Sequence, residues 1–433
     1  MPRYWLETLG CPKNQVDSDK LVGVLDGRGH LRTDDPSQSD LLVINTCAFV
    51  EAAREESIEA ILAAANQRKA GARLVVTGCL AQRYGEELAE AIPEVDLVAP
   101  FGVDPEAEVD QGSVPVRFLQ RPSMDLLELP RSPATEPWAY VKVAEGCDRK
   151  CGFCAIPSFR GRQRSRTATA VLEEISALGV SEAVLVAQDI ASWGRDALRG
   201  SSPSADPDFG MRLAGLVRSA AQAVPWVRLL YLYPSSVSDA LVDAICSTGV
   251  PYFDLSLQHA SPPLLSAMRR WGGAEKFFSL ISKIRDREPA AALRSSFVIG
   301  YPGETEEDHD RLLEFLKGAQ LDWAGFFPFS PEEGTYAASL PGAPPEGLVL
   351  ERIAECSQLQ ESITAAKRRA LVGREVEVLV VRPGRGRSYR EAPEIDGIIE
   401  VPKHLSVGSF HRLVVTDAVG PDLSATELEM AFR

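Results

Sequence analysis

Short apolar segments alternate with helix-compatible stretches along most of the chain, and this alternation limits the possible folds more than any other feature of the sequence. Between the apolar runs of the first hundred residues, Ser18–Asp26 and Glu51–Arg68 carry apolar residues at helical spacing. Strands that alternate with helices predict an α/β domain with a mostly parallel sheet over residues 1–102. The strand-like runs are Arg3–Leu9, Leu41–Asn45, Leu74–Thr77 and Leu97–Ala99.

A second series of the same kind begins at Trp138 and ends in a long helix, which we expect over Leu348–Ala370. Six strand-like segments precede that helix, and each of the first five is followed by a helix-compatible stretch. The segments are Ala139–Ala144, Ala183–Ala187, Val227–Leu232, Tyr252–Leu257, Arg294–Ile299 and Gly325–Phe329. Six β–α units over residues 136–366 predict a curved parallel sheet that forms a partial barrel, because a closed barrel of this type has eight.

Two stretches lack this alternation of strands and helices, and the end of the chain differs in composition and periodicity. Residues 103–135 are rich in proline and poorly periodic, which is typical of a linker, and Gly200–Asp208 is expected to form a surface loop. Over residues 367–433, β-branched segments interrupted by glycine and proline predict a small antiparallel β-barrel. Its strand-like segments include Glu375–Val381, Gly397–Val401 and His411–Thr416.

Composition narrows the class of protein further. No apolar run approaches the roughly 20 residues that a membrane span needs, and the first residues lack the pattern of a secretory signal. Eight cysteines among 433 residues are too sparse for a secreted disulfide scaffold, so we expect a cytoplasmic protein whose cysteines bind metal or do chemistry. The net charge is −15 and no predicted domain is strongly basic, which favours a cationic partner such as a basic protein over nucleic acid.

The strongest local motif is a CxxxCxxC run formed by Cys147, Cys151 and Cys154, directly after a predicted strand. Three closely spaced thiolates can hold an iron–sulfur cluster, as short cysteine runs do in ferredoxins. Because ferredoxin clusters take four cysteines, a run of three leaves one iron open for a ligand. The alternative is a zinc site, which would need a fourth protein ligand, and the nearest histidines in the sequence are His30 and His259.

Three further cysteines are dispersed, yet they occupy equivalent places. Cys11, Cys47 and Cys79 each follow the carboxyl end of a predicted strand of the first domain. The loops at that edge of a parallel sheet converge, so these cysteines could meet around one metal centre. The alternative is three unrelated buried cysteines. Cys246 and Cys356 fall within predicted helices without a companion cysteine, and we expect them to be core residues.

A basic run follows the CxxxCxxC motif. Its guanidinium groups could neutralise a cluster or an anionic substrate, or the run could be a solvated loop. The arginines are Arg160, Arg162, Arg164 and Arg166. Residues at the carboxyl ends of barrel strands tend to line the site, and this position is held by Gln188, His259 and Gly300. A lone histidine such as His259 is more often structural.

At this point the chain resembles the methylthiotransferases of the radical S-adenosylmethionine superfamily. The match covers essentially the whole chain in the family's domain order: an N-terminal domain with three cysteines, a linker, a radical barrel that opens with CxxxCxxC, and a TRAM barrel. Four sequence motifs are similar to those of the family branch that methylthiolates the β-carbon of an aspartate in small-subunit ribosomal protein twelve. The motifs that carry this likeness are ETLGCPKNQVDSD, INTCAFVEAAREESI, CAIPSFRGRQRSR and GRSYREAPEIDG.

The alternative is the family's tRNA-modifying branch, which typically reads GCQMN where this chain has GCPKN, and which usually carries a more basic barrel. The target carbon of the family is an unactivated C–H that no side-chain base can deprotonate, so the chemistry calls for a radical supplied by a cofactor. The resemblance implies two 4Fe-4S clusters, S-adenosylmethionine and a reducing electron donor. It implies no membrane partner, and RNA contact would be secondary.

The resemblance also assigns roles to residues. Cys147, Cys151 and Cys154 would hold the cluster that chelates S-adenosylmethionine, whereas Cys11, Cys47 and Cys79 would hold the cluster that delivers sulfur. The residues implied to lie against bound S-adenosylmethionine are Phe153, Gln188, Ile299 and Gly300.

One loop of the predicted C-terminal barrel carries charges of both signs. Gly386–Gly397 contains Glu391, Glu394 and Asp396 beside two arginines, and these acids could contact lysines of a basic partner protein. The alternative is that the acids only cap turns of the barrel.

Overall fold

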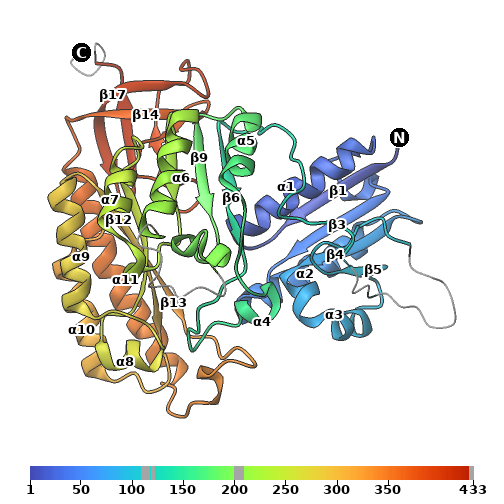
Figure 1. The fold of residues 1–433 in the computed structure, drawn as a ribbon, viewed down its shortest axis with the longest axis horizontal. Helices are drawn as coiled ribbons and strands as arrows, with labels where there is room; N and C mark the ends of the chain where they lie inside the picture. The colour runs from blue at the N-terminus through green and yellow to red at the C-terminus, as the bar shows by residue number, and fades with distance from the viewer. Residues whose placement is uncertain (109–117, 119–121, 199–208, 429–433) are drawn as a thin grey trace. The chain divides into compact units, whose positions relative to one another are not determined.

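The computed structural model describes residues 1–108, 118, 122–198 and 209–428 (Figure 1). These residues form two compact units, and each is described by itself. Unit 1 is Met1–Pro133, Tyr140–Arg149 and Ala155–Glu174; unit 2 is Ala134–Ala139, Lys150–Cys154 and Ile175–Arg433. The domain boundaries expected from the sequence stay a prediction. The loop expected at Gly200–Asp208 and much of the expected linker lie outside the described residues.

Unit 1 is built on a five-stranded sheet in the order β2-β1-β3-β4-β5, whose strand pairs are parallel as the sequence predicts. The two-residue strand β2 was not among the predicted strands. Its strands are β1 (Arg3–Thr8), β2 (Leu31–Arg32), β3 (Leu41–Thr46), β4 (Arg73–Gly78) and β5 (Leu97–Ala99). Every residue of β3 is buried, which is typical of a central parallel strand covered on both faces.

Helices cover both faces of this sheet. Helix α1 (Pro12–Gly27) packs Leu21 and Leu25 on one face, whereas α2 (Glu51–Gln67) and α3 (Cys79–Ala91) pack on the other. Helix α1 begins earlier than the apolar spacing predicts, because Pro12 at its first turn is preorganised for a helix and its missing N–H costs nothing there. The same unit holds α4 (Ile156–Arg160) and the short antiparallel pair β7 (Ala144–Glu145) and β8 (Arg164–Ser165).

The six strands predicted for the second series are present. They form two three-stranded sheets, β10-β9-β6 and β11-β12-β13, and a single parallel bridge between Leu232 and Leu255 links the chain after β10 to β11. The strand order therefore follows the chain, as a partial (βα)6 barrel requires. The bounds are β6 (Trp138–Lys142), β9 (Glu182–Val186), β10 (Trp226–Leu229), β11 (Tyr252–Gln258), β12 (Ala292–Ile299) and β13 (Trp323–Pro328).

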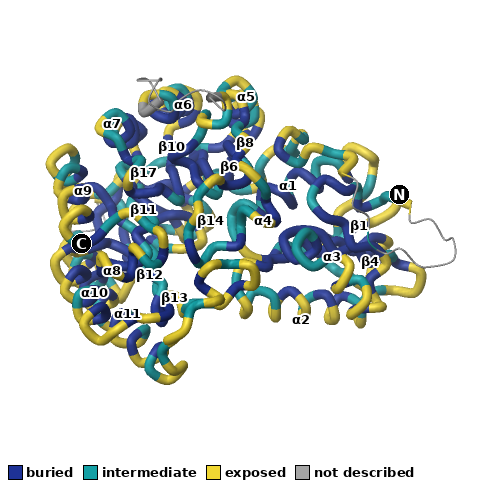
Figure 2. Tube along the Cα trace, turned by 60° about the horizontal axis from the view of Figure 1, so that its bottom comes forward, coloured by how far each residue is buried: buried dark blue, intermediate teal, exposed yellow. Residues whose placement is uncertain are grey.

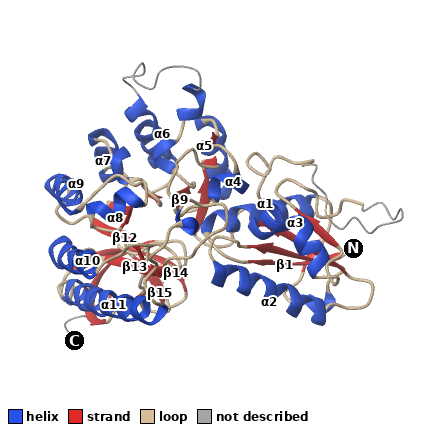
Figure 3. Ribbon diagram, turned by 90° about the horizontal axis from the view of Figure 1, so that it is seen from below, coloured by secondary structure: helices blue, strands red, loops and turns tan. Residues whose placement is uncertain are grey.

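Helices lie outside β12 and β13 (Figure 3), and the outward sides of α9 and α10 are exposed while the strands inside them are buried (Figure 2). Thr305 and Asp308 form a capping box that starts α10. Cys356 is buried in α11 as expected, but Cys246, at the end of α7, is only half-buried. The helices are α5 (Ala168–Leu178), α6 (Phe209–Ala223), α7 (Asp239–Cys246), α8 (Pro262–Ala267), α9 (Ala274–Arg287), α10 (Glu306–Ala319) and α11 (Glu346–Arg369). Across the described ranges, no helix combines the length and apolarity that crossing a bilayer demands.

The C-terminal strands close into a small barrel in the order β14-β15-β16-β18-β17. Four of its strand pairs are antiparallel, as predicted, but β16 and β18 pair in parallel and so close the barrel. Its core is aliphatic and includes Val378, Leu413 and Leu423. The strands are β14 (Glu375–Arg382), β15 (Arg385–Arg387), β16 (Ile399–Glu400), β17 (Phe410–Val419) and β18 (Asp422–Thr426).

A buried ionic triad fixes this barrel to the parallel strands of unit 2. Glu182 of β9 accepts from Nε of Arg228 at 2.7 Å and from Nη2 of Arg387 at 2.6 Å. The side chains of Glu182 and Arg228 are fully buried, and that of Arg387 is 4% exposed. Charge-assisted bonds of this kind are strong and directional, and they offset the desolvation of the three charges.

The loop after β15 does not face solvent with its acids, so the expectation that these acids recognise a partner protein is wrong. Glu391 is buried, pairs with Arg368 of α11, and accepts from the N–H of Ser388 at 2.7 Å. The side chain of Asp396 is 1% exposed, accepting from the hydroxyl of Tyr252 at 2.6 Å and from a backbone N–H. Of the three acids only Glu394 is exposed. The alternative, in which the acids cap turns, describes this loop.

Removing the shared carboxylate of the buried triad should destabilise unit 2. We expect Glu182→Ala to lower the apparent free energy of unfolding by about 3–5 kcal/mol, because Arg228 and Arg387 would stay buried without their partner. Glu400→Ala, at an exposed position of β16, should change it by no more than about 0.5 kcal/mol. Urea denaturation followed by circular dichroism measures both, and a loss below about 1 kcal/mol for Glu182→Ala would contradict the role of the triad.

Stability should also depend on pH through Asp396. Burial raises the pKa of this carboxyl from 3.8 to about 6, although Arg294 and the Tyr252 hydroxyl oppose the rise. Because the raised pKa favours the protonated form, Asp396 imposes no penalty on stability below about pH 3.8, an increasing penalty as the pH rises from 3.8 to about 6, and its full penalty above that. Asp396→Asn should therefore be more stable than the parent by about 2–3 kcal/mol at pH 7.5, by about 1 kcal/mol at pH 4.5, and nearly equal to it at about pH 3. Thermal unfolding at several pH values tests this, and a gap that does not change with pH would refute it.

Candidate functional site

The three dispersed cysteines lie at one edge of the sheet of unit 1. Cys11 follows β1 and caps α1, Cys47 follows β3, and Cys79 follows β4 and begins α3. Since β1, β3 and β4 are parallel neighbours, these positions fall on the same edge. Gly10 adopts φ +91°, and a Cβ there would lie 2.8 Å from Sγ of Cys47. The loop that carries Cys11 therefore packs directly against the thiol of Cys47, in a space open only to glycine.

The thiols influence one another electrostatically. Burial, together with the neighbouring Cys79 and Cys11, raises the pKa of Cys47 to about 12. Burial also raises the pKa of Cys79, although Arg160 opposes this rise. For Cys11, burial is outweighed by Lys13, Arg160 and local backbone N–H groups, so its pKa lies below the ordinary value. The structure thus brings these three cysteines into one electrostatic neighbourhood.

Sulfur is the donor that iron–sulfur clusters take, so this donor set fits a cluster. In the part of the chain that is described, no three His, Cys, Asp or Glu side chains are arranged to hold a single metal ion. A single metal ion must be reached by all of its ligands at once. In a four-iron cluster each cysteine binds a different iron, so its ligands stand further apart than the ligands of one zinc ion.

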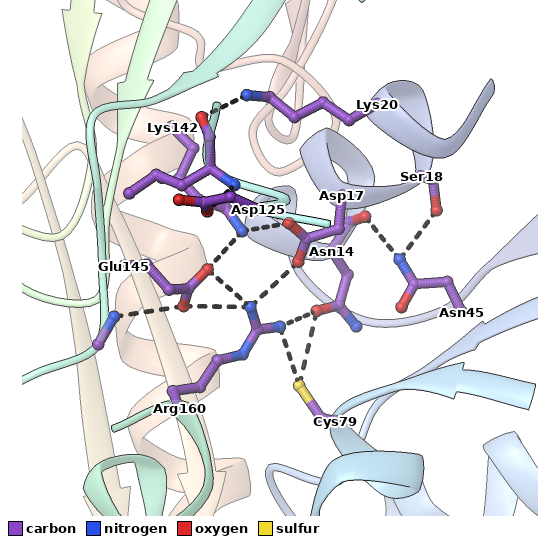
Figure 4. A network of polar contacts seen from close by, with 12 residues as sticks. Asn14, Asp17, Ser18, Lys20, Asn45, Cys79, Asp125, Lys142, Glu145 and Arg160 are labelled. Atoms are coloured by element: carbon purple, nitrogen blue, oxygen red, sulfur yellow. Dashed lines mark hydrogen bonds and ion pairs between the residues drawn. The ribbon is translucent and has the colours of Figure 1, made fainter. Parts of the chain in front are cut away.

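Arg160 is a buried cation at this edge of the sheet (Figure 4). Its Nη2 donates to Sγ of Cys79 at 3.1 Å and to Oδ1 of Asn14 at 2.6 Å. Its Nη1 donates to Oδ2 of Asp17 at 3.0 Å and to Oε2 of Glu145 at 3.0 Å. The side chain of Arg160 is only 2% exposed. The guanidinium thus joins the thiol of Cys79 to two carboxylates and an amide in the interior of unit 1.

A second cation completes the network. Lys142 of β6 is buried, forms an ion pair with Asp17, and lies 2.7 Å from Oε2 of Glu145. Burial would raise the pKa of Glu145, but Arg160 and Lys142 lower it to about 2, so this carboxyl is ionised at neutral pH. Asn14 holds the sheet edge by donating to the carbonyls of Leu9 and Thr46 at 2.9 and 3.0 Å.

Sequence reasoning missed most of this network. The signals were a lysine inside an apolar strand, at Lys142, and an α1 whose first half is nearly devoid of apolar residues. The arginines of the basic run differ in how far their side chains are exposed. Arg162 and Arg164 have side chains 77% and 55% exposed, as the solvated-loop alternative expects. Arg166 is buried and pairs with Glu174 at 2.7 Å.

The first cysteine of the CxxxCxxC motif belongs to unit 1. The N–H of Cys147 donates to the carbonyl of Gly161 at 3.1 Å, and the N–H of Arg149 donates to Sγ of Cys147 at 3.4 Å. Gly146 has φ +78°, and a Cβ there would lie 2.3 Å from the carbonyl oxygen of Arg162. The backbone therefore turns tightly before Cys147, and a backbone donor faces its sulfur.

The other two cysteines of the motif belong to unit 2, where their loop is fixed by its backbone. Gly152 donates to the carbonyl of Met268 at 2.9 Å and accepts from the N–H of Ala337 at 2.8 Å. Nη1 of Arg270 lies 3.4 Å from Sγ of Cys151. Cys151 and Cys154 are both half-buried. Within unit 2, two neighbouring thiols, one of them facing a guanidinium, are sulfur donors of the kind that an iron–sulfur cluster takes.

The four residues implied to contact S-adenosylmethionine lie at the expected ends of elements. Phe153 is half-buried in the cysteine loop, and Gln188 is half-buried just after β9. Ile299 is the buried last residue of β12, and Gly300 follows it with φ +83°, where a Cβ would lie 2.5 Å from Val349. Their common contact with a ligand stays a prediction.

His259 lies in the interior, with one of its two ring nitrogens hydrogen-bonded. It is fully buried after β11, and its Nδ1 accepts from the N–H of Ser261 at 3.1 Å. Burial lowers its pKa to about 4, although Asp308 opposes this. The ring is therefore neutral at physiological pH.

Three family models match the chain in sequence. They are "Uncharacterized protein family UPF0004" over residues 3–100, "Radical SAM superfamily" over residues 141–316 and "TRAM domain" over residues 372–427. The radical S-adenosylmethionine match implies S-adenosylmethionine and a 4Fe-4S cluster as cofactors. The solved structure of the radical S-adenosylmethionine methyltransferase TsrM from Kitasatospora setae aligns with a TM-score of 0.47 at 16% identity, over 84% of this chain and 89% of that chain.

Curated relatives match over nearly the full length. "Ribosomal protein uS12 methylthiotransferase RimO" of Carboxydothermus hydrogenoformans is 38% identical, over 96% of this chain and 97% of the relative. The protein of the same name from Moorella thermoacetica is 42% identical, over 93% of both chains. The protein is thus an enzyme, and it belongs to the RimO family of radical S-adenosylmethionine methylthiotransferases.

Proposed function

We propose that this enzyme adds a methylthio group to the β-carbon of an aspartate in ribosomal protein uS12 of the small subunit. The observation that carries the proposal is the identity of 38–42% to proteins named for that activity, over more than nine-tenths of each chain. The net charge of −15 supports it, because an acidic enzyme attracts a basic ribosomal protein and repels a phosphate backbone. RNA contact is then secondary.

We assign the two cysteine triplets to two 4Fe-4S clusters. Cys147, Cys151 and Cys154 would hold the cluster that binds S-adenosylmethionine, and Cys11, Cys47 and Cys79 would hold the cluster that presents sulfur. When bound, these cofactors supply the one-electron chemistry that an unactivated C–H needs and that no protein side chain can supply.

The protein's own residues hold and orient these groups. Polar hydrogens face the sulfurs in both triplets: the N–H of Arg149 on Cys147, the guanidinium of Arg270 on Cys151, and that of Arg160 on Cys79. Such donors stabilise thiolates in a buried site. Phe153, Gln188, Ile299 and Gly300 would bind S-adenosylmethionine beside the first cluster. A reducing partner must supply electrons, and we place the reaction in the cytoplasm.

The substrate is tested by mass spectrometry of uS12 and of bulk tRNA from a strain that lacks the gene. We expect the methylthio modification to disappear from uS12, to return on complementation, and to remain unchanged in tRNA. Loss of a methylthio group from tRNA with intact uS12 would instead place the enzyme in the tRNA-modifying branch.

Replacing Cys147, Cys151 and Cys154 with Ala should remove one of two clusters. We expect iron in the anaerobically reconstituted protein to fall from about eight to about four per chain, since each cluster holds four. Formation of 5′-deoxyadenosine from S-adenosylmethionine should stop. Cys246→Ala, a half-buried cysteine in α7, is the matched control and should keep both. Continued formation of 5′-deoxyadenosine in the triple variant would overturn this assignment.

Replacing Cys11, Cys47 and Cys79 with Ala should separate the two half-reactions. Reductive cleavage of S-adenosylmethionine should persist, because the other triplet keeps its own ligands, whereas methylthiolated product should fall below detection. Cleavage is measured by chromatography of 5′-deoxyadenosine, and product by mass spectrometry of a uS12 peptide. Product formation at the parent rate would show that these cysteines do not present sulfur.

A further inference from the structure

Arg160 follows the CxxxCxxC motif closely in the sequence, yet its guanidinium meets a cysteine of the other triplet. It belongs to unit 1, at the end of α4, and its Nη2 lies 3.1 Å from Sγ of Cys79. Arg162 and Arg164, from the same basic run, have largely exposed side chains. Arg160 therefore lies in the N-terminal thiol site, whereas Arg162 and Arg164 lie at the surface.

We propose that Arg160 is a positioning residue for the N-terminal cluster: its guanidinium fixes the sulfur of Cys79 and supplies the positive charge that stabilises the reduced cluster. The proposal rests on the function proposed above, in which Cys11, Cys47 and Cys79 hold that cluster. It adds a specific residue and a specific property, the reduction potential.

The geometry of the guanidinium supports this role over a general electrostatic one. Nη2 points to Cys79 and Asn14, and Nη1 points to Asp17 and Glu145, so the two ends of one planar fork have separate partners. A planar fork with several fixed donors can satisfy both groups at once, whereas a lysine offers a single point charge. The carboxylates thus hold the guanidinium while its other end faces the sulfur.

The charges of the network support it too. Lys142 is paired with Asp17 and Glu145, so within this network two cations balance two carboxylates before any thiol ionises. A thiolate at Cys79 then adds negative charge directly against Arg160. The potential of an iron–sulfur cluster depends on net charge and on hydrogen bonds to its sulfurs, and a cation that donates to a ligand sulfur favours the reduced state.

The test uses the full-length protein in which Cys147, Cys151 and Cys154 are Ala, so that the N-terminal cluster is observed alone. Arg160→Gln, Arg160→Lys and the matched control Arg162→Gln are added to this parent. Iron content and the midpoint potential are measured, the latter by a redox titration followed by electron paramagnetic resonance. We expect Arg160→Gln to shift the reduction equilibrium at least tenfold towards the oxidised cluster, which is 59 mV for a one-electron couple. Arg160→Lys should restore part of the shift, and Arg162→Gln should match the parent.

Arg160→Gln leaves Asp17 and Glu145 with less positive charge, so its fold is checked by circular dichroism. If it does not fold, Arg160→Gln with Asp17→Asn removes one charge of each sign and takes its place. Loss of iron from a folded Arg160 variant, with iron kept in Arg162→Gln, also supports the proposal.

A parent potential in Arg160→Gln or its compensated form would overturn the proposal and leave Arg160 a purely structural residue. Failure of every Arg160 variant to fold would do the same. Absence of iron from the parent itself would show that Cys11, Cys47 and Cys79 hold no cluster, which overturns the two-cluster function as well, so the two failures are distinguishable.

Discussion

Parallel pairing of neighbouring strands places their carboxyl ends along one edge of a sheet, and the chemistry-bearing residues of both units depend on this constraint. In unit 1 it gathers Cys11, Cys47 and Cys79 behind β1, β3 and β4. In unit 2 it puts Gln188 after β9 and Gly300 after β12. Residues far apart in the chain thereby come to lie at the same edge of a sheet. The loops at those edges carry the candidate site residues, while the strands supply the rigid frame.

Buried charges occur at two places where they hold one group in a fixed orientation against another. One network holds Arg160 against Cys79, and another holds the C-terminal barrel to β9 through Glu182. Buried ion pairs add little net stability compared with apolar packing, but they are costly to break and demand a particular geometry. Such pairs therefore fix orientation, which suits a ligand sulfur and a docked barrel better than the adaptable packing of aliphatic side chains.

Much of the fold was predictable because periodicity is a local property. The strands of both series appear within a few residues of their predicted ends, since apolar runs bounded by turn residues identify them without tertiary information. Helix α1 was predicted too short because its first turns carry polar residues, Asn14 and Asp17 among them, whose buried partners come from other elements. The parallel pair β16 and β18 was also missed, because the direction of a strand pair follows from closure of the barrel and not from either strand's composition.

The sequence by itself predicted two sets of candidate ligand cysteines, since the spacing of Cys147, Cys151 and Cys154 and the strand-end positions of the other three are local patterns. It also determined the family, because the motifs run the length of the chain. Only the tertiary structure decided where each charge goes. Arg160, Arg162, Arg164 and Arg166 are equivalent in sequence, yet one is buried on a thiol, one pairs inside unit 1 and two are exposed. Likewise Glu391 and Asp396 lie in a charged loop that is typical of a surface, but both are buried. The physical reason is that the free energy of a charge depends on its desolvation and on its partners, and both are set by residues distant in the chain.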